Sequence, residues 1–324
     1  MAQFADAQAA AAVREREPRR LDVSARLLGD RLFAFATLAL ALLILCILFG
    51  ITVALILDST ASIKKFGLGF IVSTDWNPAT DTYGALPFIY GTAVSSAIAL
   101  IIAVPLSLGT ALCLSETLPE WLSRKVGFLV ELLAAIPSVV YGLWAIFVLG
   151  PGLRDYVEPA LGRYLGFIPL FQGPHVAVGM LTAGVVLAIM ILPYIASVST
   201  DVFRAIPESQ REAALALGAT RWETIQMAVL PYGRSGVIGA IIFGLGRALG
   251  ETIAVAMVIG NRPEISSSLF RPSATLASVI ANEFAEATTR LYVSSLTELG
   301  LVLLALGLLL NVAAHMLVHG TTQH

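Results

Sequence analysis

Six long apolar stretches run through this sequence, and they constrain its fold more than any other feature. A helix that crosses the hydrocarbon core of a bilayer needs about 20 mostly apolar residues. The six stretches all reach such a length, and they lie at about 32–57, 87–114, 126–149, 176–198, 237–259 and 299–318. The sequence therefore predicts an all-α integral membrane protein with six transmembrane helices.

Composition supports this prediction. Only 13% of the 324 residues are charged and the mean hydropathy is +0.83, whereas a soluble domain carries about 25% charged residues. The net charge of −2 provides no basic surface for a nucleic acid, so a nucleic-acid partner is not expected. Cys46 and Cys113 lie in apolar runs and are expected to be buried core side chains. Since no histidine has ligand spacing to a cysteine, we expect no bound metal.

The chain is expected to divide at the ends of these apolar stretches. A cytoplasmic N-terminal tail at 1–30 precedes the first transmembrane helix at 31–57 and an external loop at 58–86. The core at 87–318 holds five transmembrane helices, and 319–324 form a cytoplasmic C-terminal tail. With the N-terminus inside, twelve basic residues lie on the cytoplasmic side and seven outside. This bias predicts that both termini are cytoplasmic, and contact with membrane lipid follows from the spans themselves.

The cytoplasmic segment 201–231 carries strong helix signals. Pro207 suits the first position of a helix, and Gly218 suits the left-handed residue that ends one. Thr220 followed by Glu223 has the spacing of a capping box for a second helix. The segment is therefore expected to form a helix, a tight glycine turn and a short second helix.

Small side chains lie on the first of these two helices. Ala213 and Ala214 would allow the backbone of another protein to approach closely, as in recognition of a helix by a groove. An ordinary helical hairpin, in which alanine serves only helix propensity, is the alternative that the residues leave open.

Two opposite charges lie within the fifth span. Arg247 and Glu251 are four residues apart, so they are expected to share a helix face. Each would cost about 2.5–3.5 kcal/mol at the centre of a lipid-facing helix, so both are expected to face protein or water. Gly246 and Gly250 have the spacing that lets a neighbouring helix come close. These residues indicate a translocation pathway, and the alternative is a salt bridge that only fixes packing. Glu131 in the third span is expected to reach the cytoplasmic interface, and the alternative is that it joins the charged pathway.

One motif in segment 201–231 resembles the EAA loop of ABC importer permeases. Its residues are Glu212-Ala213-Ala214, Gly218 and Leu230-Pro231; Ala228 replaces the usual branched apolar residue. The resemblance implies a type I ABC importer permease fold in which Glu212, Ala213, Ala214 and Gly218 couple the chain to a cytoplasmic ATPase. It also implies that ATP and Mg²⁺ bind on that partner. We expect no cofactor and no catalytic residue in this chain, which has no GxxxxGK[ST] motif.

Three further segments, at 136–150, 244–261 and 269–287, resemble the phosphate importer permeases of the Pst system, of the PstC type. The resemblance implies that Arg247 and Glu251 line the pathway of inorganic phosphate. It also implies a paralogous PstA-type permease, a PstB-type ATPase dimer and an external PstS-type phosphate-binding protein as partners. The implied location is the bacterial plasma membrane.

Two alternatives stay open from the sequence. The first is a permease for another oxyanion, such as sulfate or molybdate. The second is a membrane scaffold that reports phosphate supply without carrying phosphate.

Overall fold

The computed structural model describes residues 23–321 of the chain, so most of the predicted N-terminal tail and the end of the C-terminal tail lie outside the described residues. The chain divides into two units, Met1–Ala54 and Leu55–His324. Helix α2 begins in the first unit, at Val23, and ends at Asp58. Most of its large apolar side chains from Leu32 to Leu57 are exposed. A helix that is apolar all round is typical of a span that faces lipid.

The second unit is all-helical, apart from two isolated β-bridges. Its elements are α3 (Thr60–Phe66), α4 (Gly69–Val72), η1 (Pro78–Thr80), α5 (Leu86–Leu112), η2 (Cys113–Thr117), α6 (Glu120–Ala134), α7 (Ser138–Trp144), η3 (Ala145–Leu149), α8 (Gly150–Gly152), η4 (Leu153–Val157), α9 (Glu158–Leu165), η5 (Pro169–Phe171), α10 (Met180–Arg204), α11 (Glu208–Ala216), α12 (Arg221–Thr224), η6 (Ile225–Val229), α13 (Leu230–Gly250), α14 (Ile253–Val258), α15 (Leu276–Glu283) and α16 (Arg290–Thr321).

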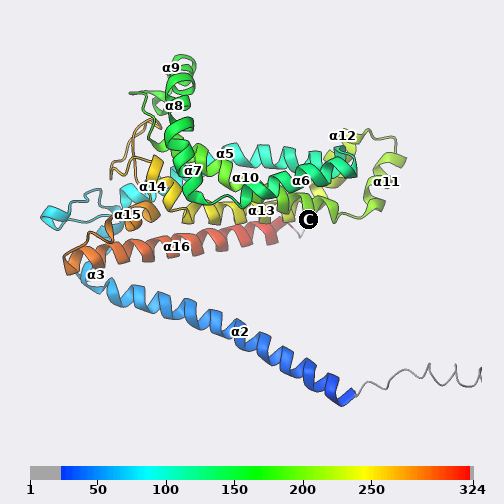
Figure 1. Cartoon of the computed structure of the whole chain (residues 1–324), viewed down its shortest axis with the longest axis horizontal. Coiled ribbons are helices and arrows are strands. Elements are labelled where there is room, and N and C mark those ends of the chain that lie inside the picture. Colours follow the sequence, from blue (N-terminus) through cyan, green and yellow to red (C-terminus); the bar gives the residue numbers. More distant parts are fainter. Residues whose placement is uncertain (1–22, 322–324) are drawn as a thin grey trace, which may run out of the picture. The chain divides into compact units, whose positions relative to one another are not determined.

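Helix α10 lies at the centre of the second unit. It packs against α5, α6 and α13, and α16 packs along α13 (Figure 1). Glycines allow two of these contacts. A Cβ on Gly184 would lie 2.5 Å from Ile98 of α5, and a Cβ on Gly244 of α13 would lie 2.6 Å from Ile195 of α10. The helices therefore approach closely because these two positions carry no side chain.

Five described helices are long and apolar enough to cross a membrane, and a bent pair provides a sixth. The prediction of an all-α protein is confirmed, and the described helices agree with the six predicted spans when the bent pair is counted as one span. The bend lies in the predicted third span, where α6 ends at Ala134 and α7 begins at Ser138, at 87° to it. Pro137 lies in this break, directly before α7. Proline lacks an N–H and disfavours helical backbone in the residue before it, so the two effects end α6.

The fifth span also differs from its predicted extent of 237–259. Helix α13 begins earlier, at Leu230, since Pro231 is tolerated in a first turn. It ends at Gly250, and the short α14 follows after Glu251 and Thr252. The predicted sixth span lies within the longer α16, which begins at Arg290.

Segments distant in sequence pack into one aromatic cluster, called the cap here, which contains Trp76, Tyr83, Phe88, Glu283 and Tyr292. Trp76, Tyr83 and Phe88 form edge-on ring contacts, and Tyr83 stacks on Tyr292 at 5.5 Å between ring centres. Trp76 Nε1 and the Tyr292 hydroxyl both donate to Glu283 Oε2, at 2.8 and 2.6 Å. The cap thereby joins the start of α5 to the start of α16.

The expectation for the two cysteines is wrong. Cys46 and Cys113 are free thiols, but both are exposed. Hydropathy does not distinguish a buried position from one that faces lipid, because apolar side chains suit both.

Candidate functional site

The side chain of Arg247 lies against an aromatic ring. Arg247 is in the last turn of α13, and its guanidinium carbon lies 4.3 Å from the ring centre of Tyr194 on α10. The ring face carries negative electrostatic potential, so it stabilises the cation without neutralising its charge. The Arg247 Nε atom is buried and has no hydrogen-bond partner. The site therefore holds a cation with a donor that is still free.

Tyrosine hydroxyls donate hydrogen bonds to backbone carbonyls at the broken end of α6. The Tyr194 hydroxyl donates to the Ala134 carbonyl at 2.8 Å, and the Tyr141 hydroxyl donates to the Leu133 carbonyl at 2.8 Å. These carbonyls belong to the last turn of α6, where the helix leaves carbonyls without their usual N–H partners; the Leu133 carbonyl also accepts from the Ile136 N–H at 3.4 Å. Non-helical backbone at membrane depth is tolerated where protein or water satisfies it. Tyr194 thus connects the α6 break to Arg247, and no local sequence pattern predicted a role for either tyrosine.

Glu251 does not share a helix face with Arg247, contrary to the prediction. Helix α13 ends at Gly250, and Glu251 has extended backbone with ψ of 124°. Its Oε1 accepts a hydrogen bond from the Ala254 N–H at 3.3 Å, which caps the start of α14. No ion pair within 4.0 Å joins Arg247 to Glu251 among the described residues. The two charges instead lie on either side of the break at the end of α13.

The predicted contact at Gly246 and Gly250 does not occur within this chain. A Cβ on either glycine would meet no described atom within 4 Å, whereas Gly244 packs against α10. The face of α13 that carries Gly246 and Gly250 is therefore open. A glycine stripe of this kind suits the approach of a helix from another chain.

The predicted structure of the segment between α10 and α13 is confirmed. Helix α11 begins after Pro207, and Gly218 adopts φ of +88° just beyond its end. Thr220 Oγ1 accepts from the Glu223 N–H, and Glu223 Oε2 accepts from the Thr220 N–H at 2.7 Å. The capping box therefore fixes the turn between α11 and α12.

Helix α11 presents its small residues outward. Glu212, Ala213 and Gly218 are exposed, and Ala214 is half-buried. Leu217, at the end of the helix, is 90% exposed. In Figure 1, α11 and α12 lie at the end of the second unit opposite to α14 and α15. The geometry leaves these residues free to contact another protein.

Arg211 fixes α11 to the rest of the chain, and the sequence analysis did not identify it. Its guanidinium binds both carboxylate oxygens of Glu116, at 3.1 and 2.8 Å. It also donates to the carbonyls of Phe203 and Ile206, each at 2.7 Å, near the end of α10. The hydrogen bonds to Glu116 raise the pKa of Arg211 above its ordinary value. One side chain thus joins α11 to the ends of α5 and α10.

Known proteins resemble this chain over most of its length. Residues 103–323 match the family described as binding-protein-dependent transport system inner membrane component. The phosphate transport system permease protein PstC of Mesorhizobium japonicum is 47% identical over 296 residues, which cover 90% of each chain. The corresponding protein of Xylella fastidiosa is 48% identical over 294 residues, which cover 90% of this chain and 88% of that relative. This chain belongs to the PstC family.

A solved structure supports the fold class of this PstC-family chain. A chain of the inward-facing MetNI methionine ABC transporter matches with a TM-score of 0.52 and 19% identity, over 74% of this chain and 94% of that one. The predicted type I ABC importer permease fold is confirmed. As a PstC-family permease, the chain is a multi-pass inner membrane component of a transport system rather than an enzyme, and it acts with other components of that system.

Proposed function

We propose that this chain is a permease subunit of an ATP-driven importer of inorganic phosphate. The observation that carries the proposal is Arg247, a cation at the junction of two broken helices with its buried Nε unpaired. A guanidinium donates parallel hydrogen bonds and so suits an oxyanion. The choice of phosphate rests on the PstC relatives, whose names assign them to phosphate transport.

Glu251 and Arg247 act together in this proposal. Broken helices that place charged groups and free backbone near the bilayer centre form substrate sites in other transporters. Arg247 attracts the anion, and the nearby Glu251 carboxylate limits how tightly it is held. The open glycine face of α13 supports a pathway between this chain and a second, PstA-type permease.

ATP hydrolysis belongs to a separate partner in the proposed importer. A PstB-type ATPase dimer binds ATP and Mg²⁺, and one of its subunits contacts Glu212, Ala213, Ala214 and Gly218. This chain binds no cofactor and no metal. Because Arg211 links α11 to α5 and α10, movement of the ATPase is transmitted to the spans. An external PstS-type protein delivers phosphate, and both termini of this chain are cytoplasmic.

Uptake of radiolabelled phosphate tests the proposal. Cells that lack the chain are complemented with wild type, Arg247→Gln, Glu251→Gln or the external control Arg163→Gln, at matched membrane expression. We expect wild type and Arg163→Gln to restore uptake, and Arg247→Gln and Glu251→Gln to lose it.

Each result has a distinct meaning. If phosphate uptake survives both Arg247→Gln and Glu251→Gln, the chain is still a phosphate permease, but these two residues do not belong to its pathway. If wild type restores no phosphate uptake with its partners present, the substrate assignment is wrong. Sulfate and molybdate would then be measured with the same strains.

A further inference from the structure

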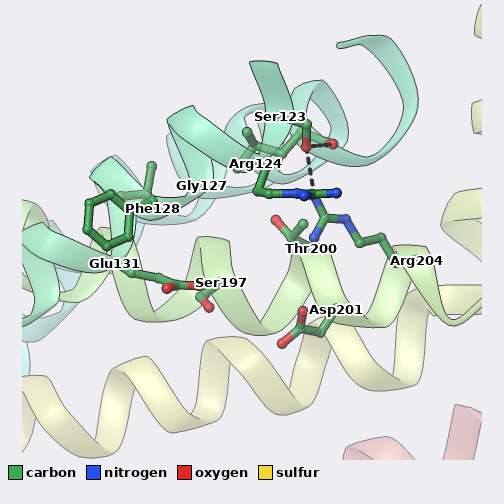
Figure 2. Close-up of a pocket in the computed structure, with 11 residues that line it drawn as sticks. Ser123, Arg124, Gly127, Phe128, Glu131, Ser197, Thr200, Asp201 and Arg204 are labelled. Atoms are coloured by element: carbon green, nitrogen blue, oxygen red, sulfur yellow. Dashed lines mark hydrogen bonds between the residues drawn. The ribbon is translucent and has the colours of Figure 1, made fainter. Parts of the chain in front are cut away.

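A cavity of about 250 Å³ lies between α6 and α10, on the side of Arg247 toward α11 (Figure 2). Two hydrogen bonds set the pairing of these helices. Tyr194 contacts Ala134 near one end of the pair, and Arg204 contacts Ser123 near the other. The two helices therefore run antiparallel, and the cavity lies in the groove between them, beside residues 197–204 of α10.

Polar side chains from both helices line this cavity, together with the apolar Leu114, Phe128 and Val130. On α10, Ser197, Asp201 and Arg204 follow one another at intervals of four and three residues, and Thr200 lies beside them, so these side chains share one face. Across the groove, α6 contributes Glu131, Arg124 and Ser123. A polar track of this kind is costly in a membrane protein unless it faces water. Glu131 lies on the wall of this cavity.

Two guanidinium groups line the end of the cavity farthest from Arg247. Arg204 donates to Ser123 Oγ at 2.7 Å and forms no ion pair within 4.0 Å among the described residues. Arg124 contacts Glu120 at 2.9 Å, in a pair whose side chains are 79% and 88% exposed. Such an exposed pair contributes little and is readily exchanged. Two neighbouring cations with free donors favour a bound anion, because it removes their mutual repulsion.

We infer that Arg124 and Arg204 form a second anion site, which holds a tetrahedral oxyanion after it passes Arg247 and before it enters the cytoplasm. Under the proposed function, on which the inference rests, this oxyanion is inorganic phosphate. The hydroxyl of Ser197 lies along the route, and the carboxylates of Asp201 and Glu131 keep the anion from binding too tightly for release.

Protection of a reporter thiol tests this site. Cys46 and Cys113 are replaced by serine, and Ser197→Cys places one thiol in the cavity wall. Inside-out vesicles that contain the full chain and its transporter partners are treated with a neutral, membrane-impermeant maleimide. Inorganic phosphate is added in one arm, and chloride of equal ionic strength in the other. Phosphate should slow labelling, and chloride should not.

Substitutions then locate the anion. Arg204→Gln and Arg124→Gln should each raise the phosphate concentration needed for half-protection by about tenfold, the effect of losing one charged hydrogen bond. Arg204→Lys keeps the charge and should retain part of the protection. The external control Arg163→Gln should leave protection unchanged.

Three results would overturn the inference: no labelling of the reporter, no protection by phosphate, or protection that both glutamine variants leave intact. Phosphate uptake by the reporter strain is measured in parallel. Phosphate uptake without protection of the reporter thiol would contradict the second site and leave the proposed function intact. If the wild-type chain gave no phosphate uptake, the proposed function itself would be contradicted.

Discussion

Tyr194 joins Arg247 to the broken end of α6. Its ring centre lies 4.3 Å from the guanidinium carbon, and its hydroxyl donates to the Ala134 carbonyl at 2.8 Å. The cation on α13 and the free carbonyl on α6 are thus held by one residue of α10. A shift of α10 would therefore change the contacts that it makes with both α13 and α6.

Substitutions at Tyr194 should separate its two contacts. Tyr194→Phe keeps the ring under Arg247 and loses the hydroxyl, whereas Tyr194→Leu loses both. A partly desolvated cation–π contact is worth about 0.5–2 kcal/mol, so we expect Tyr194→Leu to reduce phosphate uptake several-fold more than Tyr194→Phe. Initial uptake rates at matched expression measure this difference. Equal effects would show that the ring does not position Arg247.

Arg211 should be needed to couple ATP hydrolysis to phosphate uptake rather than to assemble the transporter. Its pair with Glu116 has side chains only 18% and 11% exposed, and a hydrogen bond to a charged group contributes about 1.5–3 kcal/mol. We expect Arg211→Gln to reduce uptake per ATP hydrolysed at least several-fold. Glu116→Gln should be milder, since the amide oxygen still accepts a hydrogen bond.

The matched control for Arg211 is Asp155→Asn, which removes the exposed pair with Arg154. Transport and ATP hydrolysis are measured together in proteoliposomes. An Arg211→Gln transporter with the wild-type ratio of the two rates would contradict the coupling role of this contact.

A methyl group should lower the stability of the chain at Gly91 but not at Gly246. A Cβ on Gly91 would lie 2.0 Å from the Ala274 carbonyl oxygen, whereas one on Gly246 would meet nothing within 4 Å. Overpacking against backbone costs about 1–3 kcal/mol, so Gly91→Ala should lower the unfolding temperature of the purified chain and Gly246→Ala should not. If Gly246 faces a second permease, Gly246→Leu should weaken copurification of that partner without lowering the stability of the chain alone.

The cap should depend on Glu283. Its Oε2 accepts hydrogen bonds from both Trp76 and Tyr292. Glu283→Ala leaves two half-buried donors without a partner, which costs about 1–3 kcal/mol each. We expect a clear loss of thermal stability, and no loss for the exposed control Glu286→Ala. Equal unfolding temperatures for the two variants would contradict the role of Glu283 in the cap.

The sequence alone determined which segments are long and apolar enough to cross the membrane and where the segment between α10 and α13 turns. Both depend on local patterns. Apolar length sets a span, Gly218 supplies a left-handed residue, and the spacing of Thr220 and Glu223 forms a capping box. These features need no knowledge of distant residues, so they were predictable. The sequence also marked Arg247 as unusual, because a charge in an apolar span is costly wherever the span packs.

Only the tertiary structure decided what surrounds those residues. The contact between Arg247 and Tyr194, the pair of Arg211 with Glu116 and the track between α6 and α10 all join segments far apart in the chain. The separation of Glu251 from the Arg247 helix face depended on where α13 ends, which an unbroken apolar pattern does not reveal. Periodicity assumes one continuous helix, so it fails where packing and hydrogen bonds from neighbouring helices stabilise a break.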